Sequence, residues 1–598
     1  MKHQVALLAA ALVAACSTAP PHHSPPQQAS PEAASGYVAK PGWAAATFAV
    51  AAANPLATEA GYRVLNAGGS AVDAAIAVQM VLALVEPQSS GIGGGAFLLH
   101  FDGKNVEAYD GRETAPAAAD EKLFIGADGK PLSFRDAVVG GRAVGVPGAV
   151  RMLEMAHRQH GKIPWARLFE PAIALADGGF EVSPRLATLV RSDAHLEKDA
   201  VAAAYFFGPD GQARRAGSHL RNPELAAVLR KIASEGSKAL HEGVIAQAIV
   251  KKVQSHPTNP GRMTLADLAG YQPKKRPALC HDYRARGRDY RLCGFPPPSS
   301  GAIAVGQILG ILANAHADAI PLEDGLPSAN WLHLYTEASR LAFADRAQYL
   351  GDPDFVQPPA GSWASLLAPD YLAQRASLIG ARSMKAATAG APGASPASYA
   401  PSLPQPEYGT SHISIVDARG NAVAMTSSIE DQFGSRQMVS VKGGAGGFLL
   451  NNELTDFSFE PADAQGRPVA NRVQPGKRPR SSMAPTLVFD RATGALVMSG
   501  GSPGGAMIIH YTAKTLYGVL NWGLNTQQAI DLPNFASLNG PSLLEKGRFP
   551  PATVRALRAR GADVREQDMT SGVQAIQRTP AGYFGGADPR REGIVMGD

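Results

Sequence analysis

The sequence contains little charge, and no segment of it collects charge of one sign. Charged residues make up 18% of the 598 residues, and the formal net charge is only +5. There is no compact run of Lys and Arg and no basic stripe interleaved with aromatic residues, which is the electrostatic footprint of a nucleic-acid-binding protein. We therefore expect no nucleic-acid partner. A hydrophobic content of 45% is typical of a soluble globular protein with a large core.

Long apolar runs are also missing. The most apolar internal segment, "AAIAVQMVLALV" from Ala74 to Val85, is too short to span a bilayer comfortably and carries Gln79 in its middle. This segment therefore predicts a buried helix and not a membrane span.

The N-terminus has the pattern of an export signal. A basic start, "MKHQ", is followed by the apolar stretch "VALLAAALVAA" and then by Cys16. Small residues directly before a cysteine resemble the lipobox of bacterial lipoproteins, which implies a signal peptide over residues 1–15 and a lipid on Cys16. Several acyl chains on one residue would anchor the protein stably in a membrane. We expect a protein of the bacterial cell envelope that faces the periplasm; the alternative is a signal cleaved elsewhere, with Cys16 lost or incidental.

The next segment, residues 16–37, is rich in Pro, Ser, Ala and Gln. Such a composition cannot bury enough apolar surface to fold, so it predicts a disordered tether. His22 and His23 lie in this segment without convergent ligands, and we expect no metal site there.

Cysteine is scarce, with only three in the chain. Besides Cys16 there are Cys280 and Cys293, which flank "HDYRARGRDYRL", two short runs around a glycine that are typical of a hairpin. In an exported protein these two cysteines can form a cross-strand disulfide. Two reduced cysteines are the alternative.

The remaining chain divides into a mostly helical part and a mostly extended part. Helical periodicity dominates residues 148–350, whereas alternating apolar residues dominate after residue 410. Between them, residues 381–406 are dense in Ala, Ser, Gly and Pro, which predicts a flexible surface segment. We expect an α+β fold in which both parts complete a single core. The glycine-rich "GIGGG" lacks the Lys-Ser/Thr of a phosphate loop, so it predicts a tight backbone crossing and not a nucleotide site.

Thr410 stands at the junction of these parts, in "EYGTSHISIVD". A threonine hydroxyl is a weak nucleophile, and one way to activate it is the α-amine of the same residue after that residue has become a new N-terminus. This requires cleavage of the Gly409–Thr410 bond. The pattern alone leaves this open, because linkers precede strands in many proteins.

The motifs around Thr410 and upstream of it resemble those of a known enzyme family. In chain order they are "GGSAVDAAIAV", "GIGGGAF", "YDGRETAP", "GVPGAV", "PPPSSGAI", "AFADRAQYLGDPDF", "GTSHISIVDARGNAVAMT", "LLNNELTDFS", "GKRPRSSMAPTLV" and "GGSPGG". Together they resemble the γ-glutamyltranspeptidase family (γ-glutamyltransferase, glutathione hydrolase) over about residues 45–598. The resemblance implies an N-terminal nucleophile hydrolase with an αββα sandwich. It also implies autocatalytic cleavage into a large subunit, residues 38–409, and a small catalytic subunit, residues 410–598, which stay together as a heterodimer.

The resemblance implies catalytic roles for particular residues. Thr410 matches the nucleophile, which would first attack the carbonyl of Gly409 and later the substrate. Hydroxyl-bearing positions near the nucleophile match Thr426 and Ser428, and strand alternation places both on one face. The pair that forms the oxyanion hole matches Gly504 and Gly505; glycines at a strand-to-helix turn leave backbone N–H groups free to meet negative charge.

The resemblance also implies a pocket for both charges of an amino acid. Arg112 matches the arginine that holds the α-carboxylate, for which a guanidinium fork is well suited. Ser481 and Ser482 match paired serines that hold the same carboxylate, while Glu453 and Asp456 match groups that receive the α-ammonium. The expected substrates are glutathione or other γ-glutamyl compounds, with water, amino acids or peptides as acceptors. No metal and no organic cofactor is implied.

Glu430 departs from the family pattern, because better-known bacterial members have an asparagine at this place. A carboxylate can also receive an ammonium, so recognition of an amino acid survives, but the extra charge can shift the substrate range. The mobile loop of the family should fall within residues 460–476, which contain no Tyr or Trp. The sequence therefore does not supply the usual aromatic gate in this loop, and it leaves open the balance between transfer to an acceptor and hydrolysis.

The sequence alone leaves rival functions open. Related acylases remove glutaryl groups from cephalosporins, and glutaryl has no α-ammonium. Glu430, Glu453 and Asp456 would then be carboxylates with no cation to meet, which is costly in a partly desolvated site. We therefore favour γ-glutamyl over glutaryl. Two further rivals are a polyglutamate transpeptidase and a non-catalytic envelope lipoprotein with the same fold.

Overall fold

The computed structural model describes residues 36–394, 398–403 and 405–598. The expected signal peptide, Cys16, and nearly all of the expected tether lie outside the described residues. In the part of the chain that is described, no helix is long and apolar enough to cross a membrane.

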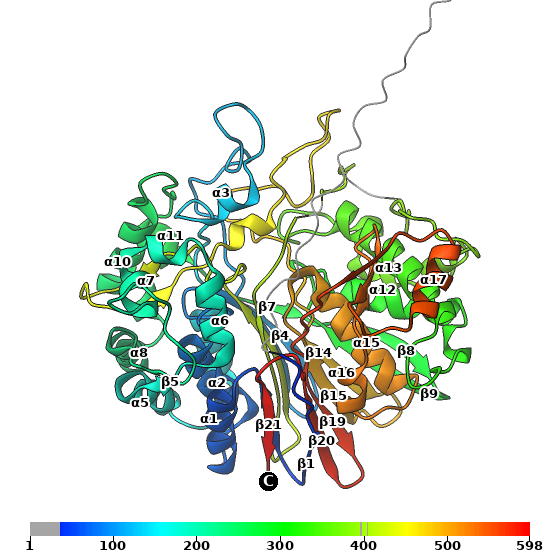
Figure 1. The fold of residues 1–598 in the computed structure, drawn as a ribbon, viewed down its shortest axis with the longest axis horizontal. Helices are drawn as coiled ribbons and strands as arrows, with labels where there is room; N and C mark the ends of the chain where they lie inside the picture. The colour runs from blue at the N-terminus through cyan, green and yellow to red at the C-terminus, as the bar shows by residue number, and fades with distance from the viewer. Residues whose placement is uncertain (1–35, 395–397, 404) are drawn as a thin grey trace, which may run out of the picture.

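Two seven-stranded antiparallel sheets lie at the centre of the molecule (Figure 1). The first sheet has the order β21 (Ile594–Gly597), β2 (Ala49–Ala52), β10 (Ser411–Val416), β11 (Ala422–Ser428), β3 (Gly95–Phe101), β4 (Val106–Asp110) and β7 (Lys274–Pro277). The second has the order β1 (Trp43–Ala45), β20 (Gly582–Ala587), β19 (Gln574–Thr579), β15 (Leu496–Gly501), β14 (Thr486–Asp490), β9 (Arg288–Gly294) and β8 (Leu279–Ala285).

Strands from both sides of the Gly409–Thr410 bond share each sheet. In the first sheet β10 and β11, which follow this bond, lie between β2 and β3, which precede it. In the second sheet β14, from after the bond, pairs with β9, from before it. Both parts of the chain therefore complete the same core, and backbone ladders would continue to join them after a cut at this bond.

The two faces of β10 have different neighbours, as strand alternation requires. Ile413 and Ile415 are buried in the core that the first sheet shares with its helices. Val416 is buried in the other core, which lies between the two sheets and extends to the helices of the second sheet. The hydroxyl of Ser414 donates a hydrogen bond across to the backbone carbonyl of Gln574 in the second sheet, 3.1 Å away. Thr410, His412 and Ser414 thus belong to the face that looks towards the second sheet.

Helices cover the outer face of each sheet (Figure 1). Those on the first sheet include α1 (Pro55–Asn66), α2 (Ala71–Val85), α4 (Ala149–His160), α5 (Glu170–Gly178), α6 (Pro184–Ser192), α8 (Pro223–Glu235) and α10 (Gly243–Gln254). Those on the second include α12 (Gly301–Asn314), α13 (Ala329–Tyr349), α15 (Ile508–Leu520) and α16 (Thr526–Asp531). The predicted α+β, four-layer αββα architecture is confirmed.

Shorter elements connect these layers. They are α3 (Phe134–Val138), α7 (Ala200–Phe206), α9 (Lys238–His241), α11 (Leu265–Gly270), α14 (Pro369–Ala376), α17 (Pro551–Ala559), β5 (Phe180–Glu181), β6 (His219–Leu220), β12 (Met438–Val439), β13 (Phe448–Leu449), β16 (Phe535–Ala536), β17 (Ser542–Glu545) and β18 (Val564–Gln567).

Helix α2 is the buried helix that the apolar run predicts. Ser70 caps its first turn, because the Ser70 hydroxyl accepts from the N–H of Asp73 while the Asp73 carboxylate accepts from the N–H of Ser70. All of its residues, Gln79 included, are buried. A helix that is apolar on every side can be stable only inside a large protein, and α2 occupies that place beneath β10 and β11.

Cys280 and Cys293 face each other across the hairpin of β8 and β9. They form a disulfide with an S–S distance of 2.05 Å. The bridge lies at the edge of the second sheet.

Candidate active site

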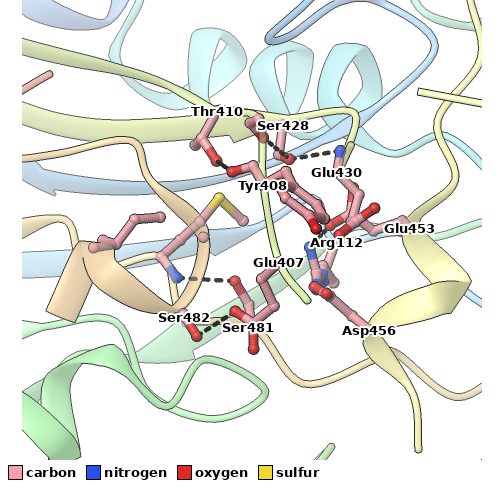
Figure 2. A pocket seen from close by; sticks show the side chains of 14 residues that line it. Arg112, Glu407, Tyr408, Thr410, Ser428, Glu430, Glu453, Asp456, Ser481 and Ser482 are labelled. Atoms are coloured by element: carbon pink, nitrogen blue, oxygen red, sulfur yellow. Dashed lines mark hydrogen bonds and ion pairs between the residues drawn. The ribbon is translucent and has the colours of Figure 1, made fainter. Parts of the chain in front are cut away.

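A small pocket lies where the chain enters β10 (Figure 2). Its volume is about 20 Å³, which is room for about one water molecule. Most of the residues singled out from the sequence line it: Arg112, Gly409, Thr410, Ser428, Glu430, Glu453, Asp456, Ser481, Ser482 and Gly505, together with Glu407, Tyr408, Met483 and Ile508. The uncut chain therefore assembles the predicted site but leaves no space in it for a substrate.

Ser428 contacts the bond that is expected to break. The pairing of His412 with Thr426 in the β10–β11 ladder places Thr410 beside Ser428 on the same face. The hydroxyl of Ser428 donates to the carbonyl oxygen of Gly409 at 2.8 Å and accepts from the N–H of Glu430 at 2.8 Å. A donor at this place polarises the carbonyl that Thr410 would attack, because negative charge develops on that oxygen.

Thr426 lies one step further along the strand, outside the lining of the pocket. Its hydroxyl contacts His412 Nδ1 at 2.8 Å, and His412 Nε2 contacts the hydroxyl of Ser414 at 3.1 Å. Because Ser414 donates its only proton to Gln574, it accepts from Nε2–H, and Nδ1 accepts from Thr426. Burial lowers the pKa of His412 to about 3, so the ring is neutral. His412 therefore orders the strand behind the nucleophile and contacts Thr426 and Ser414 instead of Thr410.

The two glycines between β15 and α15 allow a close backbone crossing. Gly504 and Gly505 have φ angles of +131° and +56°, in the region that side chains disfavour. A Cβ on Gly505 would lie 2.0 Å from the carbonyl oxygen of Glu407. Of the two glycines, only Gly505 lines the pocket. In the uncut chain the segment before Thr410 thus rests directly on the predicted oxyanion turn.

Arg112 is fully buried, and carboxylates already occupy its guanidinium. One terminal nitrogen donates to Glu453 and the other to Asp456. Nε also donates to the backbone carbonyl of Pro479, at 3.1 Å, and Nη2 to that of Arg480, at 2.9 Å. The predicted contact of Arg112 with a substrate carboxylate would need one of these bonds to open. In the uncut chain, Arg112 holds Glu453 and Asp456, the two acids that the resemblance assigns to the α-ammonium.

A cluster of carboxyl groups makes this side of the pocket acidic. Glu430, Glu453 and Asp456 line it, and buried Glu113, which the sequence did not single out, stands behind them. Burial, followed by the charges of Asp456, Asp431 and Glu453, raises the pKa of Glu430 well above its usual range. Arg112 faces several acids at once, so a ligand with a positive charge would relieve the repulsion.

Glu430 is held in an unusual conformation that presents its carboxyl group to the pocket (Figure 2). Its φ is +74°, which a non-glycine residue adopts only when the surroundings enforce it. Its Oε2 accepts from the side chains of Asn452 and Thr455, whereas its Oε1 is buried without a hydrogen-bond partner among the described residues. An unpaired carboxylate oxygen at this position is a ready acceptor for an ammonium group.

The end of the segment before Thr410 differs from its prediction. Residues 381–406 were expected to form a flexible surface segment, but Ser402 is buried, and the side chain of Glu407 just beyond it is only 9% exposed. The cause is tertiary: the Glu407 carboxylate accepts from Ser482 Oγ at 2.5 Å and from Arg346 at 2.7 Å, and Arg480 donates to Ser402 Oγ at 2.9 Å.

Sequence reasoning missed these anchoring residues although each lay within or beside a recognisable motif. Glu407 opens "EYGTSH", Arg346 lies in "AFADRAQYLGDPDF" and Arg480 precedes the paired serines. The acidic residue Glu407, shortly before the expected cleavage site, was the sequence signal that could have pointed to these anchoring residues. Tyr408, also missed, packs its ring against Phe134 with centroids 5.5 Å apart.

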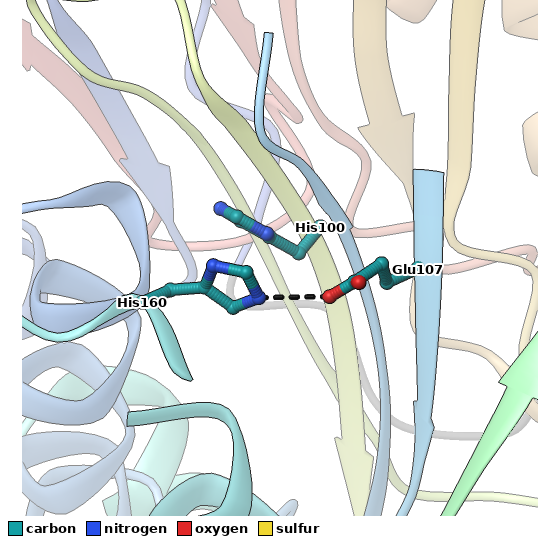
Figure 3. A group of neighbouring side chains, drawn as sticks. All are labelled: His100, Glu107 and His160. Carbon is teal, nitrogen blue, oxygen red and sulfur yellow. Dashed lines mark hydrogen bonds and ion pairs between the residues drawn. The ribbon is translucent and has the colours of Figure 1, made fainter. Parts of the chain in front are cut away.

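Among the described residues, one group has the donors to hold a metal ion: His100, Glu107 and His160 (Figure 3). One ligand atom of each lies within 4.8 Å of the others. The Glu107 carboxylate already bonds Tyr109 at 2.6 Å, His160 at 2.8 Å and Lys275 at 2.5 Å, whereas the buried Nδ1 of His100 has no hydrogen-bond partner among the described residues. His100 lies five residues along β3 from Gly95, the partner of Ser428, which is about 16 Å of strand. This group is separate from the pocket.

Similarity to known proteins extends over most of the chain. A family model described as gamma-glutamyltranspeptidase matches residues 57–598. The glutathione hydrolase proenzyme of Escherichia coli (strain K12) is 35% identical over 550 residues, which is 90% of this chain and 90% of that protein. The corresponding proenzyme of Bacillus subtilis (strain 168) is 35% identical over 561 residues, 92% of this chain and 91% of that protein. Among solved structures, a cephalosporin acylase from Bacillus halodurans has a TM-score of 0.80 at 28% identity and covers 94% of this chain and 97% of its own.

Replacing Ser428 by alanine should slow cleavage of the chain about 10- to 100-fold, because the carbonyl of Gly409 loses its hydroxyl donor. The measurement is the rate at which full-length protein disappears on a denaturing gel. Ser427→Ala is the matched control, since the Ser427 hydroxyl donates to the Gly95 carbonyl and not to Gly409. Equal rates in the two variants would show that the Ser428 hydroxyl does not assist.

Proposed function

The chain belongs to the γ-glutamyltranspeptidase family, and from this premise we propose which of its residues carry out the reaction. The protein is a γ-glutamyltransferase and glutathione hydrolase that is made as a proenzyme and processed autocatalytically. It cleaves γ-glutamyl amide bonds through an enzyme ester and passes the γ-glutamyl group to water or to an acceptor amine. The single observation that carries the assignment of residues is the pocket in which Thr410, Ser428 and the acidic cluster meet.

Maturation begins with attack by Thr410 Oγ on the carbonyl carbon of Gly409. Negative charge forms on the Gly409 oxygen, where Ser428 already donates a hydrogen bond. The C–N bond then breaks, the nitrogen of Thr410 takes a proton, and Gly409 is left as an ester on Thr410. Water opens this ester, giving a large fragment that ends at Gly409 and a small one that starts at Thr410 with a free α-amine.

Turnover uses the same hydroxyl with its own amine as the base. Thr410 Oγ gives its proton to the α-amine and attacks the γ-carbonyl of the substrate. The backbone N–H groups of Gly504 and Gly505 stabilise the oxyanion once the segment before Thr410 has left this turn. The leaving amine takes the proton from the α-ammonium, and water or an acceptor amine then attacks the γ-glutamyl ester on Thr410.

Recognition of the γ-glutamyl group rests on its two charges. The carboxyl groups of Glu430, Glu453 and Asp456 receive the α-ammonium, and Arg112 keeps the last two in place. Arg112, Ser481 and Ser482 contact the α-carboxylate, for which Arg112 releases one of its present hydrogen bonds. A glutaryl group would leave the acidic cluster without a cation, which is the physical reason to prefer γ-glutamyl substrates even though a cephalosporin acylase is a structural neighbour.

For location, we propose that a lipid on Cys16 anchors the enzyme in the bacterial cell envelope, facing the periplasm, with residues 16–37 as the tether. The support is the sequence pattern of basic start, apolar stretch and small residues before Cys16.

Purified protein should run as two fragments on a denaturing gel, and the smaller should begin with Thr410 by N-terminal sequencing. Thr410→Ala should remain one band, because it has no nucleophile, whereas Thr410→Ser keeps the hydroxyl and should still be cut. Full-length unmutated protein that persists under maturing conditions would contradict the assignment.

Glu430→Gln should raise KM for γ-glutamyl-4-nitroanilide about tenfold and leave glutaryl-4-nitroanilide unchanged or improved, because only the first has an ammonium for the carboxylate. In the unmutated enzyme KM for the γ-glutamyl substrate should fall as the pH rises above the usual titration range of a glutamate, since burial raises the pKa of Glu430 and delays formation of the carboxylate that binds the ammonium. The glutamine variant should show a weaker dependence. Faster turnover of the glutaryl substrate by the unmutated enzyme would overturn the preference.

Cys16→Ala should move the enzyme from the membrane fraction to the soluble periplasmic fraction, because the site of acylation is lost. Ser17→Ala, which keeps the cysteine, is the control. If both variants fractionate alike, the anchor is not at Cys16.

A further inference from the structure

His100, Glu107 and His160 form a group that the proposed reaction does not use (Figure 3). Neighbouring strands supply the first two residues, because His100 on β3 lies directly opposite Glu107 on β4. Residues opposite each other in an antiparallel pair point to the same face of the sheet. His160 is the last residue of α4, a helix that packs against both strands. The fold therefore brings two imidazole rings and one carboxylate together on the outer face of the first sheet.

His100 has a ligand atom that the protein does not use. The residue is only 2% exposed, and its Nδ1 has no hydrogen-bond partner in the part of the chain that the structure describes. Because an unpaired buried polar atom is unfavourable, such a group favours a partner from outside the chain. Burial lowers the pKa of His100 to about 3, so the ring is neutral. A neutral imidazole is the form that binds a metal ion.

His160 and Glu107 offer the other two ligand atoms, which lie in a crowded triangle with Tyr109. The Nε2 of His160, the hydroxyl of Tyr109 and Oε2 of Glu107 are 2.6 to 2.8 Å from one another. When His160 is neutral, these three atoms carry at most two protons, one on Nε2 and one on the hydroxyl, for three short contacts. A cation in place of the Nε2 proton would be shared by the ring nitrogen and the carboxylate.

The remaining contacts of Glu107 hold its carboxylate in place for such a cation. Its other oxygen, Oε1, accepts from Lys275 Nζ at 2.5 Å, and Lys275 also donates to Gln159 at 2.8 Å. Hydrogen bonds of this kind orient the ligands of a metal ion. His160 stands at the C-terminal end of a twelve-residue helix, where the partial negative charge of the helix also favours a cation.

The distances fit a small transition-metal ion after a modest adjustment. One ligand atom of each residue lies within 4.8 Å of the others. Atoms bound to one Zn²⁺ lie about 3 to 4 Å apart, because each bond is about 2.0 to 2.1 Å long. The side chains of His160 and Glu107 are 17% and 21% exposed, so they have room to close this difference, and water can reach them.

We propose that His100, Glu107 and His160 bind a Zn²⁺ ion, with water as the fourth ligand, and that this ion fastens the end of α4 to the β3–β4 hairpin. Two imidazoles and one carboxylate are ligands that suit Zn²⁺. On binding, Nε2 of His160 gives its proton to solvent, whereas the carboxylate and His100 each contribute a lone pair. All three ligands precede Thr410 and lie outside the pocket, so the ion stabilises the fold and takes no part in the reaction.

The first test uses the whole purified protein, cut or uncut, after a chelator has removed any metal. Equilibrium dialysis against Zn²⁺ should show one ion bound per chain. Co²⁺ is the coloured probe, since it absorbs visible light strongly when it is four-coordinate and only weakly in water. The protein should give the strong absorption with Co²⁺, and added Zn²⁺ should abolish it. No bound Zn²⁺, or bound Co²⁺ without this absorption, would overturn the proposal.

The second test removes the ligands one at a time. His100→Gln, Glu107→Gln and His160→Gln should each weaken Zn²⁺ binding at least about 100-fold, because the loss of an outer-shell partner alone costs about 10- to 100-fold. His219→Gln is the matched control, since His219 is an exposed histidine on β6 that bonds the carbonyl of Gly178. His22 and His23 remain in every variant, so any binding there is the same in all. Equal affinities in the ligand variants and the control would place the ion elsewhere and contradict the site.

Hydrogen exchange tests the fastening role. In the unmutated protein, Zn²⁺ should slow exchange of the backbone amides in β4 and in the last turn of α4 about fivefold or more, because local opening must then break metal bonds. Glu107→Gln should show no such protection. If Zn²⁺ binds but exchange in both segments is unchanged, the ion does not join them. None of these measurements requires turnover, so they stand apart from the proposed function.

Discussion

The pairing of β10 with β11 is the constraint on which the site depends. Its register sets Thr410 beside Ser428, and this alone brings a hydroxyl donor to the carbonyl of Gly409. The ladders of β10 to β2 and β11 involve residues that follow Thr410. Breaking the Gly409–Thr410 bond therefore leaves these ladders intact, and the nucleophile stays fixed while the chain before it becomes free.

Charge is distributed across the site in two opposed groups. Arg112 faces the acidic cluster, whereas Glu407 stands between Arg346 and Arg480. In the acidic group several carboxyl groups share one arginine, so a cation would relieve their repulsion. A γ-glutamyl group would bring a cation to the acidic cluster, whereas a glutaryl group would leave that cluster with its repulsion.

Much of the fold and of the pocket could be predicted from the sequence, because the signals were local or lay in recognisable motifs. Alternation of apolar residues predicted β10 and β11, and the motifs placed ten of the expected residues around one pocket. Alternation could not say that Thr426 would bond His412, since it fixes a face and not a partner. Composition also could not show that the Glu407 side chain is buried, because the segment before it is rich in Pro and Ser. Glu407 becomes part of the site only through its ion pair with Arg346, which lies on α13, a helix distant in sequence.

A cut at the Gly409–Thr410 bond would remove one of the two covalent connections that hold Glu407 in place. In the uncut chain its carboxylate is tethered on both sides, by the chain that precedes it and by Thr410 in front of β10, so it meets Arg346 at a high effective concentration. A short tether of this kind is equivalent to a ligand at millimolar level or above. After such a cut one of these tethers is gone, and the contact of Glu407 with Arg346 loses the high effective concentration that it has in the uncut chain.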